Sequence, residues 1–415
     1  MSRRPAGGGD GGSAAPLPAA PVPDAAVRLR RDSVTGVGYL VLGTWGWFLY
    51  GFGSLLPQLG EDQGISRTLT SLHSVALAVG GLIAGFAAVP LVRALRRRGV
   101  FLLGCSLSAA GCLVLAAGGA WTAATLLGAL VAGTGGSLLI NTAMPTLSDH
   151  HDGESAAALA EGNAVATGTG LVAPLVVGAG IAAGLTWRPA VLLTLPMLLA
   201  VVLVLRRQSR VPALDTVLPP RSESRRPLPR PVWPILVLIM SCVGVEFVMA
   251  AWSADLLEQR TGMSPGAAAA GVSAVITGMM LGRLVLGRLA LRYPPRPLLA
   301  GAILLTVAGW AVTWTTTSAP VALAGLLLTG LGIAGHYPMG AELMFTAATA
   351  PLRDRAAGSM SVGIAIAAGG GPFALGALAD ATSTHQAFLV VPALMLVAGA
   401  LLAVTAVRAG TARPA

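Results

Sequence analysis

Two glycine-rich stretches, far apart in the chain, contain the pattern from which the fold can be inferred. The first reads GALVAGTG over residues 128–135, and the second reads GLLLTGLG over residues 325–332. A second pair follows in the same order at nearly the same offset, APLVVGA at 173–179 and GPFALGA at 371–377. Two matches at one offset indicate an internal repeat, and their small residues suit closely packed membrane helices.

The composition around these stretches is that of a membrane protein. Of 415 residues, 54% are hydrophobic and 11% are charged, and the mean hydropathy is +0.76. Soluble domains carry about 25% charged residues, so this composition excludes a water-soluble multidomain enzyme. The high apolar content also excludes disorder over most of the chain. We therefore expect a polytopic protein whose environment is the lipid bilayer.

Apolar runs of sufficient length recur along the whole chain. A bilayer core about 30 Å thick needs about 20 helical residues. We predict an all-α membrane protein with twelve spans, at 35–58, 68–90, 100–118, 122–147, 157–184, 189–205, 232–257, 267–290, 298–317, 320–348, 356–379 and 386–407. The polar stretch 206–231 divides them into two pseudo-symmetric bundles of six. The predicted domains are a disordered cytoplasmic tail (1–33), an N-terminal bundle (34–205), a cytoplasmic linker (206–231), a C-terminal bundle (232–408) and a short cytoplasmic tail (409–415).

The basic residues predict the orientation. All 27 are arginines, and 23 of them fall on the cytoplasmic side if the N-terminus is cytoplasmic. By the positive-inside rule both termini then lie in the cytoplasm. Because these arginines flank apolar runs and form no basic face, the net charge of +10 does not indicate nucleic-acid binding. The Arg-, Ala- and Gly-rich usage predicts a bacterial plasma-membrane protein.

Glycines and arginines recur toward the ends of spans two and eight and in the loops that follow them. The first loop region contains Gly81, Gly85 and Arg93, and the second contains Gly282, Gly287, Arg288 and Arg292. With six plus six spans and a basic linker, this pattern resembles the major facilitator superfamily over about residues 34–408. The resemblance implies two six-helix bundles that alternately open a central pathway to each side. Leu291 stands where the family often has Asp.

Proline and glycine also pair inside two spans. Pro174 and Gly178 lie in span five, and Gly371 and Pro372 lie in span eleven. The span-five pair resembles the helix-kink motif of the superfamily's drug–proton antiporters, and this resemblance favours export. The fourth-span Arg of those antiporters is absent from this sequence.

Glu246 is the leading candidate for proton coupling, because an ionised group at mid-membrane costs about 3 kcal/mol and is rarely without a role. It lies midway along span seven. Carrying a proton, binding the solute and forming a structural ion pair all stay open for it. His336 in span ten is a second proton-coupling candidate, or else the partner in an interhelical hydrogen bond.

Polar and aromatic residues at mid-depth are candidates for the solute cavity. They are Trp45, Tyr50, Asn141, Asn163 and Tyr337. Aromatic rings can stack on an amphipathic solute and offer one hydrogen bond each. A lipid-facing position is equally compatible with at least one tryptophan of span one.

Arg283 and Glu161 fall in the cytoplasmic halves of spans eight and five. We expect them to form a gate that closes in the outward-facing state and breaks when the halves rock apart. A permanent ion pair within one contact is the other interpretation.

Several motifs carry no chemistry in this context. GLGIAG at 330–335 matches a nucleotide-binding pattern but has no surrounding strand, and DHHDGE at 149–154 is expected to be an acidic loop near arginines. Cys105, Cys112 and Cys242 lie in apolar runs as packing residues. We expect no cofactor, no metal and no enzymatic activity.

The sequence therefore predicts a monomeric secondary active transporter. We expect proton-coupled efflux of a small neutral, cationic or amphipathic solute, with Glu246 as the mid-depth acid and no base at that depth. Uptake of a small metabolite, proton-coupled or facilitated, is the alternative in the same class. An intramembrane transferase is an alternative from another class, disfavoured because Glu246, His336 and Arg283 are expected at three depths. A non-transporting sensor or scaffold on the same fold is a further alternative, and it would lack solute-dependent flux.

Overall fold

The computed structural model describes residues 31–151, 154–208, 214, 227–348 and 352–411, and these residues form helices joined by short turns. The N-terminal half, residues 31–208, contains α1 (Ser33–Gln63), α2 (Arg67–Ala117), α3 (Thr122–His150), α4 (Ser155–Ala182), α5 (Arg188–Leu192) and α6 (Thr194–Arg207). Residues 1–30 of the predicted tail (1–33) and most of the predicted linker lie outside the described residues.

The C-terminal half, residues 227–411, repeats this arrangement with more interruptions. It contains α8 (Val232–Thr261), α9 (Pro265–Gly271), α10 (Ser273–Leu289), α11 (Pro295–Thr315), α12 (Ala319–Ile333), α13 (His336–Ala347), α14 (Arg353–Ala381), α15 (Thr384–Ala387) and α16 (Val390–Thr411). Three predicted spans of this half are thus helix pairs, namely α9 with α10, α12 with α13, and α15 with α16, and in the N-terminal half span six is the pair α5 and α6.

Local signals set the helix ends. Asp32 caps α1, and its carboxylate accepts hydrogen bonds from the backbone N–H groups of Val34 and Thr35. Gly64 ends the same helix at φ 61°, and Gly262 ends α8 at φ 66°. Glycine adopts this left-handed conformation without a steric penalty.

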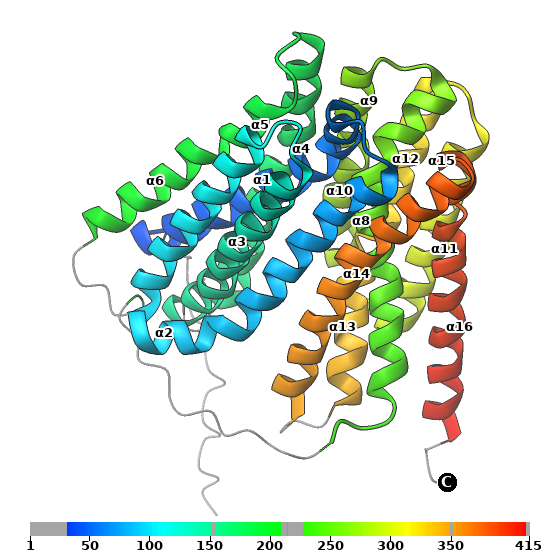
Figure 1. Cartoon of the computed structure of the whole chain (residues 1–415). Helices are drawn as coiled ribbons and strands as arrows, with labels where there is room; N and C mark the ends of the chain where they lie inside the picture. Colours follow the sequence, from blue (N-terminus) through cyan, green and yellow to red (C-terminus); the bar gives the residue numbers. More distant parts are fainter. Residues whose placement is uncertain (1–30, 152–153, 209–213, 215–226, 349–351, 412–415) are drawn as a thin grey trace, which may run out of the picture.

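Ten helical segments of the described residues are long and apolar enough to cross a membrane. The twelve-span prediction differs in two places. Spans two and three are one 51-residue helix, α2, and α1 is not among the ten segments. At about 1.5 Å per residue, a straight helix of that length would exceed twice the bilayer core. Instead, α2 reverses at Arg96 (φ 60°, ψ 167°), as Figure 1 shows, so a one-residue break replaces the predicted loop.

The glycines of the repeat make equivalent contacts in both halves. A Cβ on Gly133 would lie 2.5 Å from the Leu77 carbonyl oxygen, and one on Gly330 would lie 2.0 Å from that of Val275. Only glycine permits backbones to approach this closely. The matching stretches of the sequence therefore correspond to matching helix crossings, α3 on α2 and α12 on α10.

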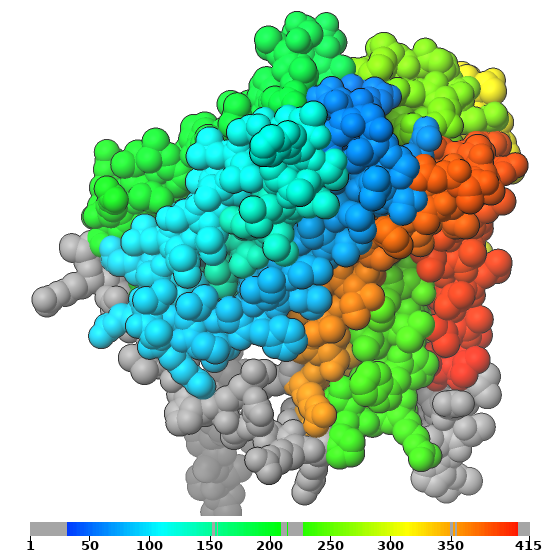
Figure 2. All heavy atoms as spheres, viewed as in Figure 1, coloured from blue at the N-terminus to red at the C-terminus, as the bar shows by residue number. Residues whose placement is uncertain are grey.

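The two halves lie side by side, and they are in closer contact at one end of the molecule than at the other. We call the end that carries Arg67 and Gly262 the Arg67 end, and the opposite end, where Arg207 and Val232 lie, the linker end. In Figure 1, α2 and α3 slope away from α8, α13 and α14 toward the linker end. Figure 2 shows α2 and α14 adjoining across the seam between the halves. At mid-depth the seam is close, because a Cβ on Gly53 would lie 2.8 Å from the Ala250 carbonyl oxygen.

Candidate functional site

The central polar cluster lies between the halves and draws on four helices. Tyr50 of α1 donates a hydrogen bond of 3.0 Å from its hydroxyl to Oε1 of Glu246 on α8. Arg283 of α10 donates a 2.8 Å hydrogen bond to the Thr167 hydroxyl on α4. The Arg283 guanidinium is also within electrostatic range of Glu246 and Tyr50. Each half therefore contributes two of these four side chains, which we call the central cluster.

The central cluster corrects the expected depths. Arg283 was expected in the cytoplasmic half at the depth of Glu161, and Glu246 was expected without a base at its depth. The structure instead brings Arg283 to Glu246. Arg283 is in α10, and the rotation of α10 that turns its side chain toward α4 and α8 depends on packing that the apolar sequence does not reveal. Glu246 therefore lies at its expected depth, midway along α8, whereas the separate, more cytoplasmic depth expected for Arg283 is wrong, because its side chain reaches Thr167 midway along α4.

Glu161 has other partners. Its carboxylate accepts hydrogen bonds from Arg31 at 2.6 and 2.9 Å and from the Tyr39 hydroxyl at 2.9 Å. In this conformation Arg283 and Glu161 are not a pair. The gate hypothesis requires their contact only in the opposite conformation, so it stays a prediction.

His336 belongs to the interior of the C-terminal half. Its ring is 1% exposed, and its Nε2 lies 3.1 Å from the Thr306 hydroxyl on α11. Its Nδ1 has no hydrogen-bond partner among the described residues. The interhelical hydrogen bond, one of the two interpretations of this histidine, is present, and a proton-coupling role stays a prediction.

The other cavity candidates are dispersed. The Trp45 ring lies directly on α3, since a Cβ on Gly136 would approach its Cζ3 to 2.1 Å. Asn163 is exposed and donates to the Leu159 carbonyl of its own helix, Asn141 is exposed, and Tyr337 is 44% exposed. Of the five candidates, Tyr50 is the one that belongs to the central cluster.

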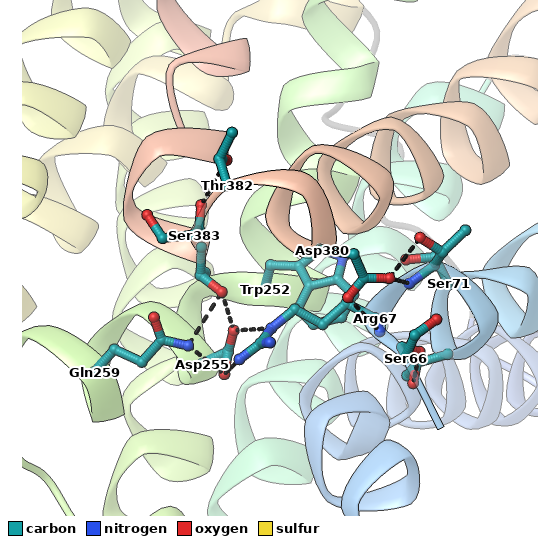
Figure 3. Close-up of polar contacts among 12 residues, drawn as sticks. Ser66, Arg67, Ser71, Trp252, Asp255, Gln259, Asp380, Thr382 and Ser383 are labelled. Carbon is teal, nitrogen blue, oxygen red and sulfur yellow. Dashed lines mark hydrogen bonds and ion pairs between the residues drawn. The ribbon is translucent and has the colours of Figure 1, made fainter. Parts of the chain in front are cut away.

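A second polar network, which sequence reasoning missed, closes the Arg67 end (Figure 3). The Arg67 Nε donates to the Asp255 carboxylate at 2.9 Å, across the seam from α2 to α8. Asp380 of α14 accepts hydrogen bonds from the backbone N–H groups of Arg67 and Thr68, at 3.0 and 2.8 Å. Asp380 thus caps the first turn of a helix in the other half. We call this network the Arg67 closure.

Further contacts reinforce the Arg67 closure. Asp255 also accepts hydrogen bonds from Gln259 and Thr384 of its own half. The carbonyl oxygen of Pro372 accepts from the Ser71 hydroxyl of α2 and from the Trp252 indole of α8. One signal could have identified this network, namely the acids near the C-terminal ends of spans seven and eleven, together with an arginine that opens span two.

The proline–glycine motifs lie at packing interfaces. Pro174 and Pro372 are inside continuous helices. A Cβ on Gly178 would lie 2.3 Å from the Gly266 carbonyl oxygen across the seam, and one on Gly371 would lie 2.9 Å from that of Gly244. The span-five motif therefore forms part of the contact between the halves.

The loop-signature residues divide between packed and open positions. A Cβ on Gly282 would lie 2.7 Å from the Leu331 carbonyl oxygen, and one on Gly81 would lie 3.2 Å from the Ser137 hydroxyl. Gly85 and Gly287 have nothing within 4 Å of such a Cβ. Arg288 lies in the last turn of α10, and Arg292 follows that helix.

Of the stretch 149–154, the residues at the linker end of α3 bind side chains at α1 and α2, and residues 152–153 lie outside the described residues. Asp149 pairs with Arg97, and the Nε2 of His150 lies 2.6 Å from the Asp32 carboxylate. His151 contacts the Thr35 hydroxyl at 2.7 Å. Among the described residues, no group of three or more His, Cys, Asp or Glu side chains could hold a metal ion.

An all-helical membrane protein with two repeated halves, polar groups at their seam and a closure at one end belongs to the class of membrane transport proteins. Comparison with known sequences specifies the class further. The Major Facilitator Superfamily profile matches residues 38–252 and 234–415. The chain belongs to this superfamily. No curated protein matches it in sequence.

Solved structures share its fold at low sequence identity. A point mutant of the nucleoside transporter NupG superposes with a TM-score of 0.75 at 11% identity, over 90% of this chain and 98% of that chain. A point mutant of the peptide transporter POT, in complex with sulfate, gives 0.73 at 15% identity, over 89% and 94%. A variant of the E. coli fucose:proton symporter FucP gives 0.61 at 18% identity, over 90% and 99%. At such identities the likeness shows the fold alone.

Proposed function

We propose that this chain is a proton-coupled secondary transporter that exports a small organic solute by alternating access of its two halves. The observation that carries the proposal is the hydrogen bond from Tyr50 to Glu246, made between the halves beside Arg283. The acceptor of this hydrogen bond is a carboxyl group that can bind a proton. The hydrogen bond itself spans the two halves and must change when the halves move.

The coupling follows from the charge of the Glu246 carboxyl group. An ionised Glu246 attracts Arg283 and accepts a hydrogen bond from the Tyr50 hydroxyl. Both interactions are stronger in a low-dielectric environment than in water. A protonated Glu246 loses the attraction to Arg283 and weakens as an acceptor. Protonation therefore changes the relative stability of the two conformations, which is what coupling requires.

We propose twelve crossings, with α1 and both arms of α2 included, and with the linker end in the cytoplasm. The arginines of residues 93–98 and 206–230 support this orientation by the positive-inside rule. The Arg67 end would then face outward, and the described conformation would be inward-facing. The cell membrane of a bacterium is the proposed location, with the monomer as the transporting unit.

The solute class that we favour is neutral and polar. The charges of Glu246 and Arg283 are opposite and cancel. The central cluster therefore offers a solute both an anionic acceptor and a cationic donor of hydrogen bonds, without a net charge. The named substrates of the similar folds, nucleosides and fucose among them, are of this kind. Cationic and amphipathic solutes belong in the same test panel.

Export is the proposed direction because the span-five motif resembles that of drug–proton antiporters and Gly178 lies at the seam. Uptake is the second candidate, favoured by the likeness to a fucose:proton symporter. Flux measured in proteoliposomes with the pH gradient imposed in either sense separates the two.

The decisive experiment compares wild type with Glu246→Gln in proteoliposomes, using a panel of labelled nucleosides, sugars and organic cations. We expect a pH gradient to drive wild-type flux and the variant to lose at least about 90% of it, because the glutamine amide cannot bind and release the proton that couples the gradient to the conformational change. Solute exchange without a gradient should persist in the variant.

Glu342→Gln is the matched control, because Glu342 is an exposed carboxylate on α13 outside the central cluster. Its gradient-driven flux should equal that of wild type. Undiminished gradient-driven flux in Glu246→Gln would contradict the role of Glu246, and wild-type flux that ignores the pH gradient would indicate facilitated diffusion.

A further inference from the structure

The internal repeat makes one glycine contact in the N-terminal half equivalent to one in the C-terminal half. A Cβ on Gly135 would lie 2.3 Å from the Ser108 backbone nitrogen, and one on Gly332 would lie 2.5 Å from that of Thr306. Ser108 and Thr306 therefore occupy the same position of the repeat. Four residues after each glycine stand Leu139 and His336.

The two halves differ in the side chain that occupies the space beside this position. In the C-terminal half the His336 imidazole fills the space and contacts the Thr306 hydroxyl at 3.1 Å. In the N-terminal half Leu139 replaces the imidazole, and a cavity of about 10 Å³ lies between α1, α2, α3 and α6. Its lining includes Leu139, Ser108 and Thr194.

Two hydroxyl groups that line this cavity lack a hydrogen-bond partner. Ser108 is 5% exposed and Thr194 is 2% exposed, and neither hydroxyl makes a hydrogen bond of normal geometry to any described residue. The Cys112 thiol lies near Thr194, but a thiol is a weak hydrogen-bonding group. Other hydroxyls of these helices donate to a carbonyl one turn earlier, as Thr142 does to Leu138. Leaving a buried hydroxyl without a hydrogen bond is costly, so a shared partner in the cavity is expected.

The size and chemistry of the cavity select that partner. A single water molecule needs about 10–15 Å³ and two to four polar contacts. Ser108 and Thr194 supply two, and Thr44, which also lines the cavity, keeps acceptor capacity after donating to the Leu40 carbonyl. Most of the remaining wall, including the Trp45 ring, is apolar.

We propose that the N-terminal half contains a specific internal site for one water molecule, bound by the hydroxyls of Ser108, Thr194 and Thr44. The water takes the place that the His336 imidazole has in the other half. It connects α1, α2 and α6 behind the Trp45 ring, which contacts the same cavity, and so stabilises the N-terminal bundle as a unit.

A double-mutant cycle on the full-length protein in lipid nanodiscs tests the site. Ser108→Ala and Thr194→Val each remove one hydroxyl with little change in volume. If the water is bound, each single variant unfolds at a lower temperature, by about 2 °C for a loss of this kind. The double variant then loses less than the sum, because it leaves no hydroxyl of this pair without a partner.

A dry cavity would give the opposite result. If no water is bound, the two hydroxyls are already without partners, and each single variant is neutral or more stable, with additive effects. That outcome overturns the proposal. Ser106→Ala, an exposed hydroxyl on the same arm of α2, should leave the unfolding temperature unchanged.

Density in a high-resolution structure provides the second measurement. A peak within hydrogen-bond distance of Ser108 and Thr194 is expected in wild type and should be absent from the double variant. A cavity without density in wild type would overturn the proposal independently of the stability data.

Discussion

Asp32 connects the start of the first helix to the end of the third. Its carboxylate caps α1, accepts from the Thr35 backbone N–H at 3.0 Å and lies 2.6 Å from the Nε2 of His150. Burial raises the pKa of Asp32, but the Thr35 backbone, His150 and the Thr35 hydroxyl together lower it by more, so that the pKa lies below its ordinary value of 3.8. The ionised carboxylate is therefore the form that stabilises this corner of the molecule.

The cap of Asp32 gives a prediction with a definite sign. A lowered pKa in the folded state means that the stabilisation is present above pH 3.8 and is lost as the pH falls through the folded-state pKa. Asp32→Ala should cost about 1 kcal/mol at pH 7. The difference in unfolding free energy between wild type and variant should shrink toward zero below pH 3.8. A difference that does not change with pH would show that the charge contributes nothing.

The interaction between Glu246 and Arg283 depends on the direction in which each side chain points from its helix. Both residues were noticed in the sequence because charge in a bilayer is expensive. Their proximity was not foreseen, because residue numbers give approximate depth and say nothing of which way each helix is rotated.

Among the elements, the crossings of α3 on α2 and of α12 on α10 depend on glycine. A Cβ on Gly330 would lie 2.0 Å from the Val275 carbonyl oxygen, and one on Gly278 would lie 2.0 Å from that of Leu327. Backbones at this distance leave no room for a methyl group, and a carbonyl of a regular helix cannot move aside without loss of its own hydrogen bond.

Gly330→Ala should therefore lower the unfolding free energy by about 1–3 kcal/mol through overpacking. Gly287→Ala is the matched control in the same half, because nothing lies within 4 Å of its added Cβ. Alanine has the higher helix propensity, so the control should be neutral or more stable by up to about 1 kcal/mol. Thermal unfolding in nanodiscs measures both. Equal effects of the two changes would refute the close crossing.

For the molecule as a whole, the Arg67 closure favours one conformation over the other. The ion pair from Arg67 to Asp255 and the cap from Asp380 join α2 to α8 and α14. These contacts break when the Arg67 end opens, so they contribute to the free-energy difference between the two conformations.

Asp380→Ala should shift the population toward the conformation that is open at the Arg67 end. Loss of a helix cap costs about 1–2 kcal/mol, or about 5- to 30-fold in the equilibrium. Distances between spin labels placed on the two halves at this end measure the shift.

Asp62→Ala is the control for Asp380→Ala, because Asp62 binds Arg188 and Trp187 within one half. The control should leave the distance distribution unchanged. An unchanged distribution in Asp380→Ala would mean that the cap does not contribute to the closure.

The class of fold, the repeat and the approximate helix positions could be predicted from the linear chain. Apolar length, glycine spacing and arginine distribution are properties of that chain, and the bilayer and helix geometry convert them directly into spans. Which polar residues meet, such as Glu246 with Tyr50 and Arg67 with Asp255, became apparent only from the packed helices. These contacts depend on the rotation of each helix about its axis, which a nearly uniform apolar surface leaves undetermined until the helices pack.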